Sequence, residues 1–108
     1  MNISDETIDD SSVIRLEGSF DTTTAQAVQA HLDGLIDGGA TTVVVDLGAV
    51  EFVSSAGLRV LLATAKRLRP IGALRLFGLN PSVREVFDVS GFSTIIPIFD
   101  DQAAAIAG

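Results

Sequence analysis

The segment that most constrains the fold is Thr41-Thr42-Val43-Val44-Val45-Asp46-Leu47, an almost continuous β-branched run. A strand with one face in water alternates apolar and polar residues, and this run does not alternate. Unbroken apolar runs of this kind are typical of a central strand covered on both faces. The run therefore predicts a sheet with further structure packed above and below it.

Four other segments have strand-like patterns. Residues 13–18 are β-branched and closed by Gly18, and residues 3–8 could pair with them as a hairpin across residues 9–12. Residues 73–78 predict another strand. Residues 94–98 predict a short one, placed at a sheet edge or a strand end because it contains Pro97. These segments supply the neighbours that a central strand needs.

Helical patterns alternate with the strands. The first has apolar residues at three- and four-residue spacing and stops at Gly38-Gly39, as at a C-cap. The second ends near Pro70 and Gly72, and places Lys66, Arg67 and Arg69 on its exposed face. A third starts at Pro81, which suits the first helical turn, and ends at Ser90-Gly91, while the acidic, Ala-rich tail from residue 100 to 107 predicts a last helix. This order predicts an α/β domain with a mixed sheet. The apolar positions of the first two helices are Ala25, Val28, Leu32, Leu35, Ile36, Leu58, Leu61, Leu62, Ala65 and Leu68.

Composition limits the classes of function. The 108 residues are 47% hydrophobic, enough for one domain, residues 1–108. The absence of Cys excludes disulfides and thiolate chemistry, and the single His31 leaves no His cluster for a metal. A net charge of −7 disfavours nucleic acid and anionic membranes as partners. No signal-peptide pattern or run of about 20 apolar residues is present, so we expect a cytoplasmic location, no membrane association and no cofactor.

The segment Val53-Ser54-Ser55-Ala56-Gly57 joins the central strand to the second helix and carries the chemistry of interest. One Ser is accounted for as a helix N-cap, worth about 1 kcal/mol. Three features favour more than a cap: there are two hydroxyls, the small Ala56-Gly57 pair leaves them accessible, and a helix N-terminus tolerates an added anion. A phosphate on Ser55 would leave its helix folded and change the surface charge by nearly two units.

The alternative chemistry at this point is catalysis by Ser55. The G-x-S-x-G nucleophile motif is absent, because Val53 stands two residues before Ser55, and His31 is the only candidate base. We therefore predict no catalytic residues, no metal site and no enzyme activity. Asp21 has two interpretations: it caps the first helix, or it lies near Ser55 because the strands before the two segments are neighbours.

Longer motifs resemble one known family. The run Val43–Leu47 followed by Phe52–Leu58 resembles the STAS domain of bacterial anti-sigma factor antagonists. Gly18-Ser19-Phe20-Asp21 is similar to the family's segment before its first helix, and residues 80–92 are similar to its penultimate helix and the turn after it. The resemblance covers nearly the whole chain.

The resemblance implies a single STAS-like α/β domain, with a four- to five-stranded mixed sheet, about four α-helices, and helices packed on one side. It also implies partner switching. The unphosphorylated antagonist binds an anti-sigma factor that is a serine kinase, phosphorylation at the position of Ser55 releases it, and a PP2C-type phosphatase reverses the change. Transcription is regulated through the sigma factor that is freed.

By the same resemblance, the switch surface for the partner comprises five positions besides Ser55. The family often has Asp-Ser-Ser-Gly where this chain has Ser54-Ser55-Ala56-Gly57, so an acid beside the phosphoacceptor is missing. That departure favours an alternative, a constitutive STAS scaffold or a subunit of another bacterial signalling complex. A further alternative is a module that holds a nucleotide or another anion at the helix start, although a Gly-rich cradle is lacking. The switch-surface positions are Asp21, Ser54, Ala56, Gly57 and Arg59.

Overall fold

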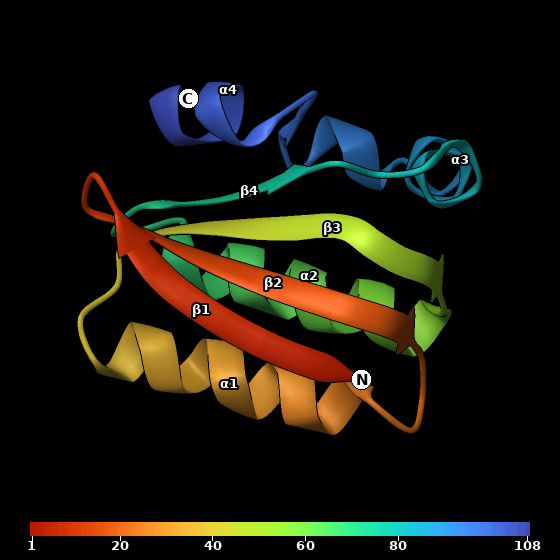
Figure 1. Ribbon diagram of the computed structural model, residues 1–108, viewed down its shortest axis with the longest axis horizontal. Helices are drawn as coiled ribbons and strands as arrows, with labels where there is room; N and C mark the ends of the chain where they lie inside the picture. The colour runs from red at the N-terminus through yellow and green to blue at the C-terminus, as the bar shows by residue number, and fades with distance from the viewer.

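The computed structural model describes residues 1–108 and contains one five-stranded sheet with the strands in chain order (Figure 1). Strand β1 pairs antiparallel with β2, and β2, β3, β4 and β5 pair parallel to one another. The mixed sheet predicted from the sequence is confirmed. The strands are β1 (Asn2–Ile8), β2 (Ser11–Phe20), β3 (Thr42–Val53), β4 (Ala73–Phe77) and β5 (Ile98–Phe99).

Helices cover both faces of this sheet. Helices α1 and α2 lie side by side under one face, while α4 lies over the opposite face (Figure 1). The expectation of helices on one side only is therefore wrong. Alternate residues of a strand point to opposite faces of the sheet, and because Val43, Val44 and Val45 are all apolar, both faces of the central strand need to be covered. The helices are α1 (Ala25–Asp37), α2 (Ser55–Leu68), α3 (Pro81–Ser90) and α4 (Gln102–Ala107), with a short 3₁₀ turn η1 (Phe92–Thr94).

Two apolar cores correspond to the two faces. The larger one packs β2 and β3 against α1, α2 and α3, and contains Leu32, Leu61 and Phe87 at full burial. The smaller one lies under α4 and joins Ala105 to Val13, Val44 and Phe77. The continuous β-branched run is thus explained, because Val43 and Val45 enter the larger core while Val44 enters the smaller one.

Strand β3 is longer than the sequence predicts. The apolar run in the sequence ends at Leu47, but the strand continues to Val53. Its pairing with β2 shifts register twice, between Arg15 and Glu17 and between Gly18 and Ser19, so that β3 carries an extra residue at each place. Each extra residue is a β-bulge, which interrupts the apolar alternation that sequence patterns depend on.

The β1–β2 turn is shorter than predicted. It contains only Asp9 and Asp10, both at positive φ (49° and 67°), as a two-residue type I′ hairpin turn requires. Asp and Asn tolerate this conformation better than other non-glycine residues. Ser11 and Ser12 therefore belong to β2, where Ser11 is buried.

The C-terminal region departs most from prediction. The strand expected at residues 94–98 is mainly the 3₁₀ turn and a connecting loop, and β5 has only two residues. Helix α4 is tied to the sheet at both ends: Arg15 donates to Gln102 at 2.7 Å, and Arg75 donates to the carbonyls of Ala105 and Ile106. None of the helices has the length and apolar character needed to cross a membrane.

Candidate functional site

The two adjacent serines have different structural positions. Ser54 is the N-cap of α2, with extended backbone angles, and its hydroxyl accepts a hydrogen bond from the Gly57 amide at 3.4 Å. Its own amide donates to the Phe20 carbonyl at 2.9 Å, which links the end of β2 to the start of α2. The Ser54 side chain is therefore already used in holding the helix terminus.

Ser55 is the first residue of α2, and its side chain is free. It is exposed to solvent, and its hydroxyl makes no hydrogen bond within the protein. It also stands at the positive end of the helix dipole, beside amides that have no partner within the helix. Of the two hydroxyls, that of Ser55 is the one available to another molecule.

Gly57 has a packing role rather than a surface role. It is buried, and a Cβ added there would lie 2.8 Å from the carbonyl oxygen of Phe20 and 3.0 Å from its ring. From the sequence, Gly57 is expected to give a partner access to the serines. In the structure, it lets the first turn of α2 pack directly on Phe20, and so it determines where Ser55 lies.

Asp21 lies beside this helix start through the backbone. It follows Phe20, which pairs with Val53 and accepts from the Ser54 amide, so the sheet brings the two segments together as expected. Its carboxylate accepts from the Thr23 amide at 2.9 Å and from the Thr23 hydroxyl at 2.7 Å. These hydrogen bonds, the one from the hydroxyl first, lower the pKa of Asp21 below its ordinary value.

The interpretation of Asp21 as the cap of α1 is wrong. The N-cap is Thr24, whose side chain makes no capping bond; its hydroxyl instead donates to the Ser19 carbonyl at 2.8 Å. Asp21 starts the preceding tight turn, where its carbonyl accepts from the Ala25 amide at 2.8 Å. Asp21 therefore fixes the shape of the loop next to Ser54, and no hydrogen bond joins its side chain to either serine.

Ala56 and Arg59 complete the predicted switch surface. Ala56 is half-buried and packs against the larger core. Arg59 is exposed, and none of the ion pairs of the protein includes it. Residues four apart on a helix are neighbours, and helical side chains lean toward the N-terminus, so Arg59 lies on the same side of α2 as Ser55. A free cation therefore stands one turn from the free hydroxyl.

An exposed apolar groove adjoins this surface. Phe52, three residues before Ser55, is 53% exposed, while its neighbour Val53 is buried. Beside it, α3 presents Val86 and the 81% exposed Val89. Two neighbouring hollows of about 110 and 390 Å³ share Ser82 and Val86 in their lining. We call the surface formed by Phe52, Ser82, Val86 and Val89 the α3 groove.

Sequence reasoning missed the α3 groove, although one signal was present. The core-facing stripe of α3 needs only Val83 and Phe87, which are the buried residues of that helix. Val86 is partly buried against the larger core, whereas Val89 is exposed and apolar beyond this requirement, and exposed apolar surface is typical of an interaction site. The rim is acidic, since Glu51 and Glu85 line the two hollows.

Comparison with known families assigns the class of protein. The family model described as STAS domain matches residues 2–105. This match covers nearly the whole chain, and the sheet order and helix positions described above agree with it. The protein belongs to the STAS domain family, among its anti-sigma factor antagonists, as the relatives described next show.

Two curated relatives have this description. The chain is 42% identical over 108 residues to a putative anti-sigma factor antagonist, BtrV, of Bordetella bronchiseptica, covering 99% of this chain and 93% of BtrV. It is 30% identical over 96 residues to the anti-sigma F factor antagonist of Paenibacillus polymyxa, covering 87% and 82% of the two chains.

Solved structures agree on the fold. An anti-sigma factor antagonist from Mycobacterium paratuberculosis superposes with a TM-score of 0.92 at 26% identity, covering 98% of this chain and 91% of the other. The phosphorylated form of the Bacillus cell fate determinant SpoIIAA superposes with a TM-score of 0.76 at 26% identity, covering 98% and 97%.

Proposed function

We propose that this protein is a phosphorylation-controlled anti-sigma factor antagonist, acting as a single cytoplasmic domain and not as an enzyme. Without phosphate it binds an anti-sigma factor that has serine kinase activity, and this frees a sigma factor. Phosphorylation of Ser55 by that kinase releases the partner, and a PP2C-type phosphatase restores the binding form. Asp21, Ser54, Ala56, Gly57 and Arg59 form or position the partner-binding surface around Ser55.

The observation that carries this proposal is the different use of the two hydroxyls. Ser54 caps α2, so modifying it would remove a hydrogen bond that holds the helix. Ser55 is exposed and its hydroxyl makes no hydrogen bond within the protein, so a phosphate can be added there without breaking one. The modification would therefore change the surface and leave the fold intact, as a reversible switch requires.

The release step follows from charge and burial. Phosphate adds about −1.5 to −2 charges at neutral pH. A partner that covers Ser55 and the α3 groove buries that site, and a buried phosphate whose charge Arg59 neutralises only in part costs several kcal/mol. A cost of about 4 kcal/mol weakens binding about a thousandfold. A partner surface that fits the hydroxyl closely would thus be lost on phosphorylation.

The test uses matched baits tethered through the C-terminus. Wild-type protein, Ser55→Asp, Ser55→Ala and Ser4→Asp are exposed to a lysate of the source cell with Mg-ATP, and bound proteins and phosphosites are identified by mass spectrometry. Ser4→Asp is the matched control because Ser4 is an exposed serine on the edge strand β1, opposite Arg15 and not at the end of β2 that contacts Ser54. We expect a protein kinase of the anti-sigma type on wild type and Ser4→Asp, at least about tenfold less on Ser55→Asp, and phosphate on Ser55.

One observation favours a second candidate, a constitutive STAS scaffold with the same binding surface and no phosphorylation. Ser54 stands where an acid often precedes the phosphoacceptor, so a charge that a kinase could recognise is absent. The capping role of that position is kept, however, because the Ser54 hydroxyl accepts from Gly57 as a carboxylate would. Equal capture by wild type and Ser55→Asp, with no phosphate on either serine, would establish the scaffold and refute the switch.

A further inference from the structure

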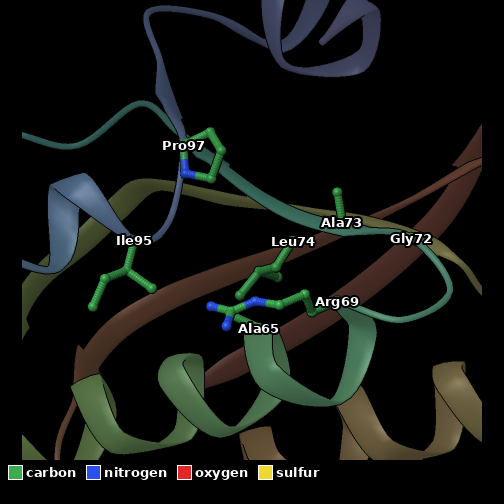
Figure 2. A pocket seen from close by; sticks show the side chains of 7 residues that line it. All are labelled: Ala65, Arg69, Gly72, Ala73, Leu74, Ile95 and Pro97. Atoms are coloured by element: carbon green, nitrogen blue, oxygen red, sulfur yellow. The ribbon is translucent and has the colours of Figure 1, made fainter.

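A small cavity lies at the C-terminal end of α2, the end opposite Ser55. It is bounded by the last turns of α2, the start of β4 and the loop between η1 and β5, and its volume is about 150 Å³ (Figure 2). None of the proposed switch residues lines it, so its role is independent of the proposed function. The lining residues are Ala65, Arg69, Gly72, Ala73, Leu74, Ile95 and Pro97.

Arg69 gives the cavity a free cationic group. Its side chain extends from the end of α2 beneath Leu74 and toward Ile95 (Figure 2). In this acidic chain Arg67 is paired with Asp33 and Asp37, but no carboxylate or carbonyl accepts from Arg69. A guanidinium presents a planar set of donors that matches a carboxylate.

The backbone of Leu74 adds an unused donor and an unused acceptor. In β4 the Ala73 amide donates toward β3, to Thr41, so the amide and carbonyl of Leu74 point to the other side, toward β5. The hydrogen bond toward β5 is made two residues later, where the Leu76 amide donates to the Pro97 carbonyl. Pro97 has no N–H to give the Leu74 carbonyl, and the Ile95 carbonyl does not accept from the Leu74 amide.

These unused backbone groups lie at the base of a cavity that opens to solvent, since Arg69, Gly72, Ile95 and Pro97 of its lining are exposed. Leu74 is 3% exposed, and buried backbone groups in proteins are nearly always hydrogen-bonded to something. In an extended strand the N–H and C=O of one residue point the same way and lie close together. The cavity therefore offers an adjacent donor and acceptor beside a guanidinium, with apolar walls from Ala65, Ile95 and Pro97.

The cavity volume limits the size of the ligand. One water needs about 10–15 Å³ of such space, so the cavity holds a molecule of several non-hydrogen atoms. Pockets for drug-sized ligands are larger, about 300–1,000 Å³. The ligand is thus small, anionic and partly apolar, and it has a donor next to its acidic group.

We propose that this cavity binds a short-chain α-hydroxy carboxylate. The carboxylate accepts hydrogen bonds from Arg69 and from the Leu74 amide. The α-hydroxyl donates to the Leu74 carbonyl and takes the place of the N–H that Pro97 lacks. The short alkyl chain packs on Ile95 and Pro97.

The test is a titration of ¹⁵N-labelled protein with α-hydroxybutyrate, followed at the Leu74 amide resonance. Butyrate, which lacks only the hydroxyl, is the matched ligand, and sodium chloride controls for ionic strength. The variants are Arg69→Gln, the control Lys66→Gln on the exposed side of the same helix, and Pro97→Ala, which restores an N–H opposite the Leu74 carbonyl. Amide dispersion shows that each variant is folded.

We expect a saturable shift of the Leu74 amide in wild type and Lys66→Gln, and binding weaker by at least about tenfold in Arg69→Gln. Wild type should prefer α-hydroxybutyrate over butyrate, and Pro97→Ala should lose that preference. The proposal is overturned if Leu74 shows no saturable shift, if Arg69→Gln binds as wild type does, or if butyrate binds wild type equally well. None of these results depends on whether Ser55 is phosphorylated.

Discussion

Replacing Gly57 by Ala should destabilise the protein, although Ala is the better helix former. In a helix interior, Gly→Ala gains about 1 kcal/mol. At Gly57, however, the new Cβ would lie 2.8 Å from the Phe20 carbonyl oxygen. That oxygen is held by the hydrogen bond from the Ser54 amide at 2.9 Å, so it cannot withdraw without breaking the link between β2 and α2.

Gly34 provides the matched control, because it is also inside a helix and a Cβ there has no atom within 4 Å. Gly34→Ala should therefore gain the full propensity term, about 1 kcal/mol. Overpacking costs about 1–3 kcal/mol, so Gly57→Ala should lose up to about 2 kcal/mol, and the two variants should differ by about 1–3 kcal/mol. For a domain of this size each kcal/mol corresponds to about 4–8 °C in Tm.

The assay is urea unfolding followed by circular dichroism, with thermal unfolding as a second measurement. An unchanged m-value shows that the comparison concerns stability alone. If Gly57→Ala is stabilised as much as Gly34→Ala, then α2 does not depend on close packing against Phe20, and the explanation of Gly57 is refuted.

Three further predictions concern the start of α2. Ser54→Ala should lower the free energy of unfolding in urea by about 1 kcal/mol because the helix cap is lost, whereas Ser55→Ala should stay within about 0.5 kcal/mol of wild type. Equal losses would contradict the different roles assigned to the two serines. The lowered pKa of Asp21 means that the charged carboxylate stabilises the fold. The stability advantage of wild type over Asp21→Asn should therefore be complete at neutral pH, above the ordinary pKa of 3.8, and should disappear as the pH falls through the lowered pKa. A pH-independent difference would exclude this cause. With phosphoserine incorporated at position 55, a pH titration followed by ³¹P NMR should give a second phosphate pKa below the usual value of about 6, because Arg59 is its i,i+4 neighbour. Arg59→Gln should raise that pKa. An unchanged pKa would show that Arg59 does not reach the phosphate.

Local patterns predicted the elements whose signals lie in short segments. The spacing of apolar residues located α1 and α2, and the pair Gly38-Gly39 located the end of α1. Ser54 and Ser55 could be identified as a cap and a candidate site, because capping depends on residues only three positions apart. Which serine caps could not be read from the pattern, because it depends on where β2 places the Phe20 carbonyl.

Non-local features escaped prediction. The direction of Phe52 depends on the register between β2 and β3, which no local pattern records. The short β5 depends on which residue of the loop faces β4, and Pro97 marks that place without giving its partner. The α3 groove arises because α3 packs beside the end of β3, an arrangement that only the folded chain provides.

The two bulges of β3 also determine which changes of length the protein can tolerate. They place Val50 and Val53 in the core with two exposed residues between them, so that Phe52 faces solvent next to Ser55. Deleting one of the extra residues would remove a bulge and leave Val50 and Val53 paired with Gly18 and Phe20 in the core. Deleting a residue from the regular part of β3, between Val43 and Asp46, would instead shift the register and invert the faces of the residues on one side of the deletion. The two bulges are therefore the places where β3 can change length without exchanging its core and surface residues, whereas the run from Val43 to Asp46 must keep its length.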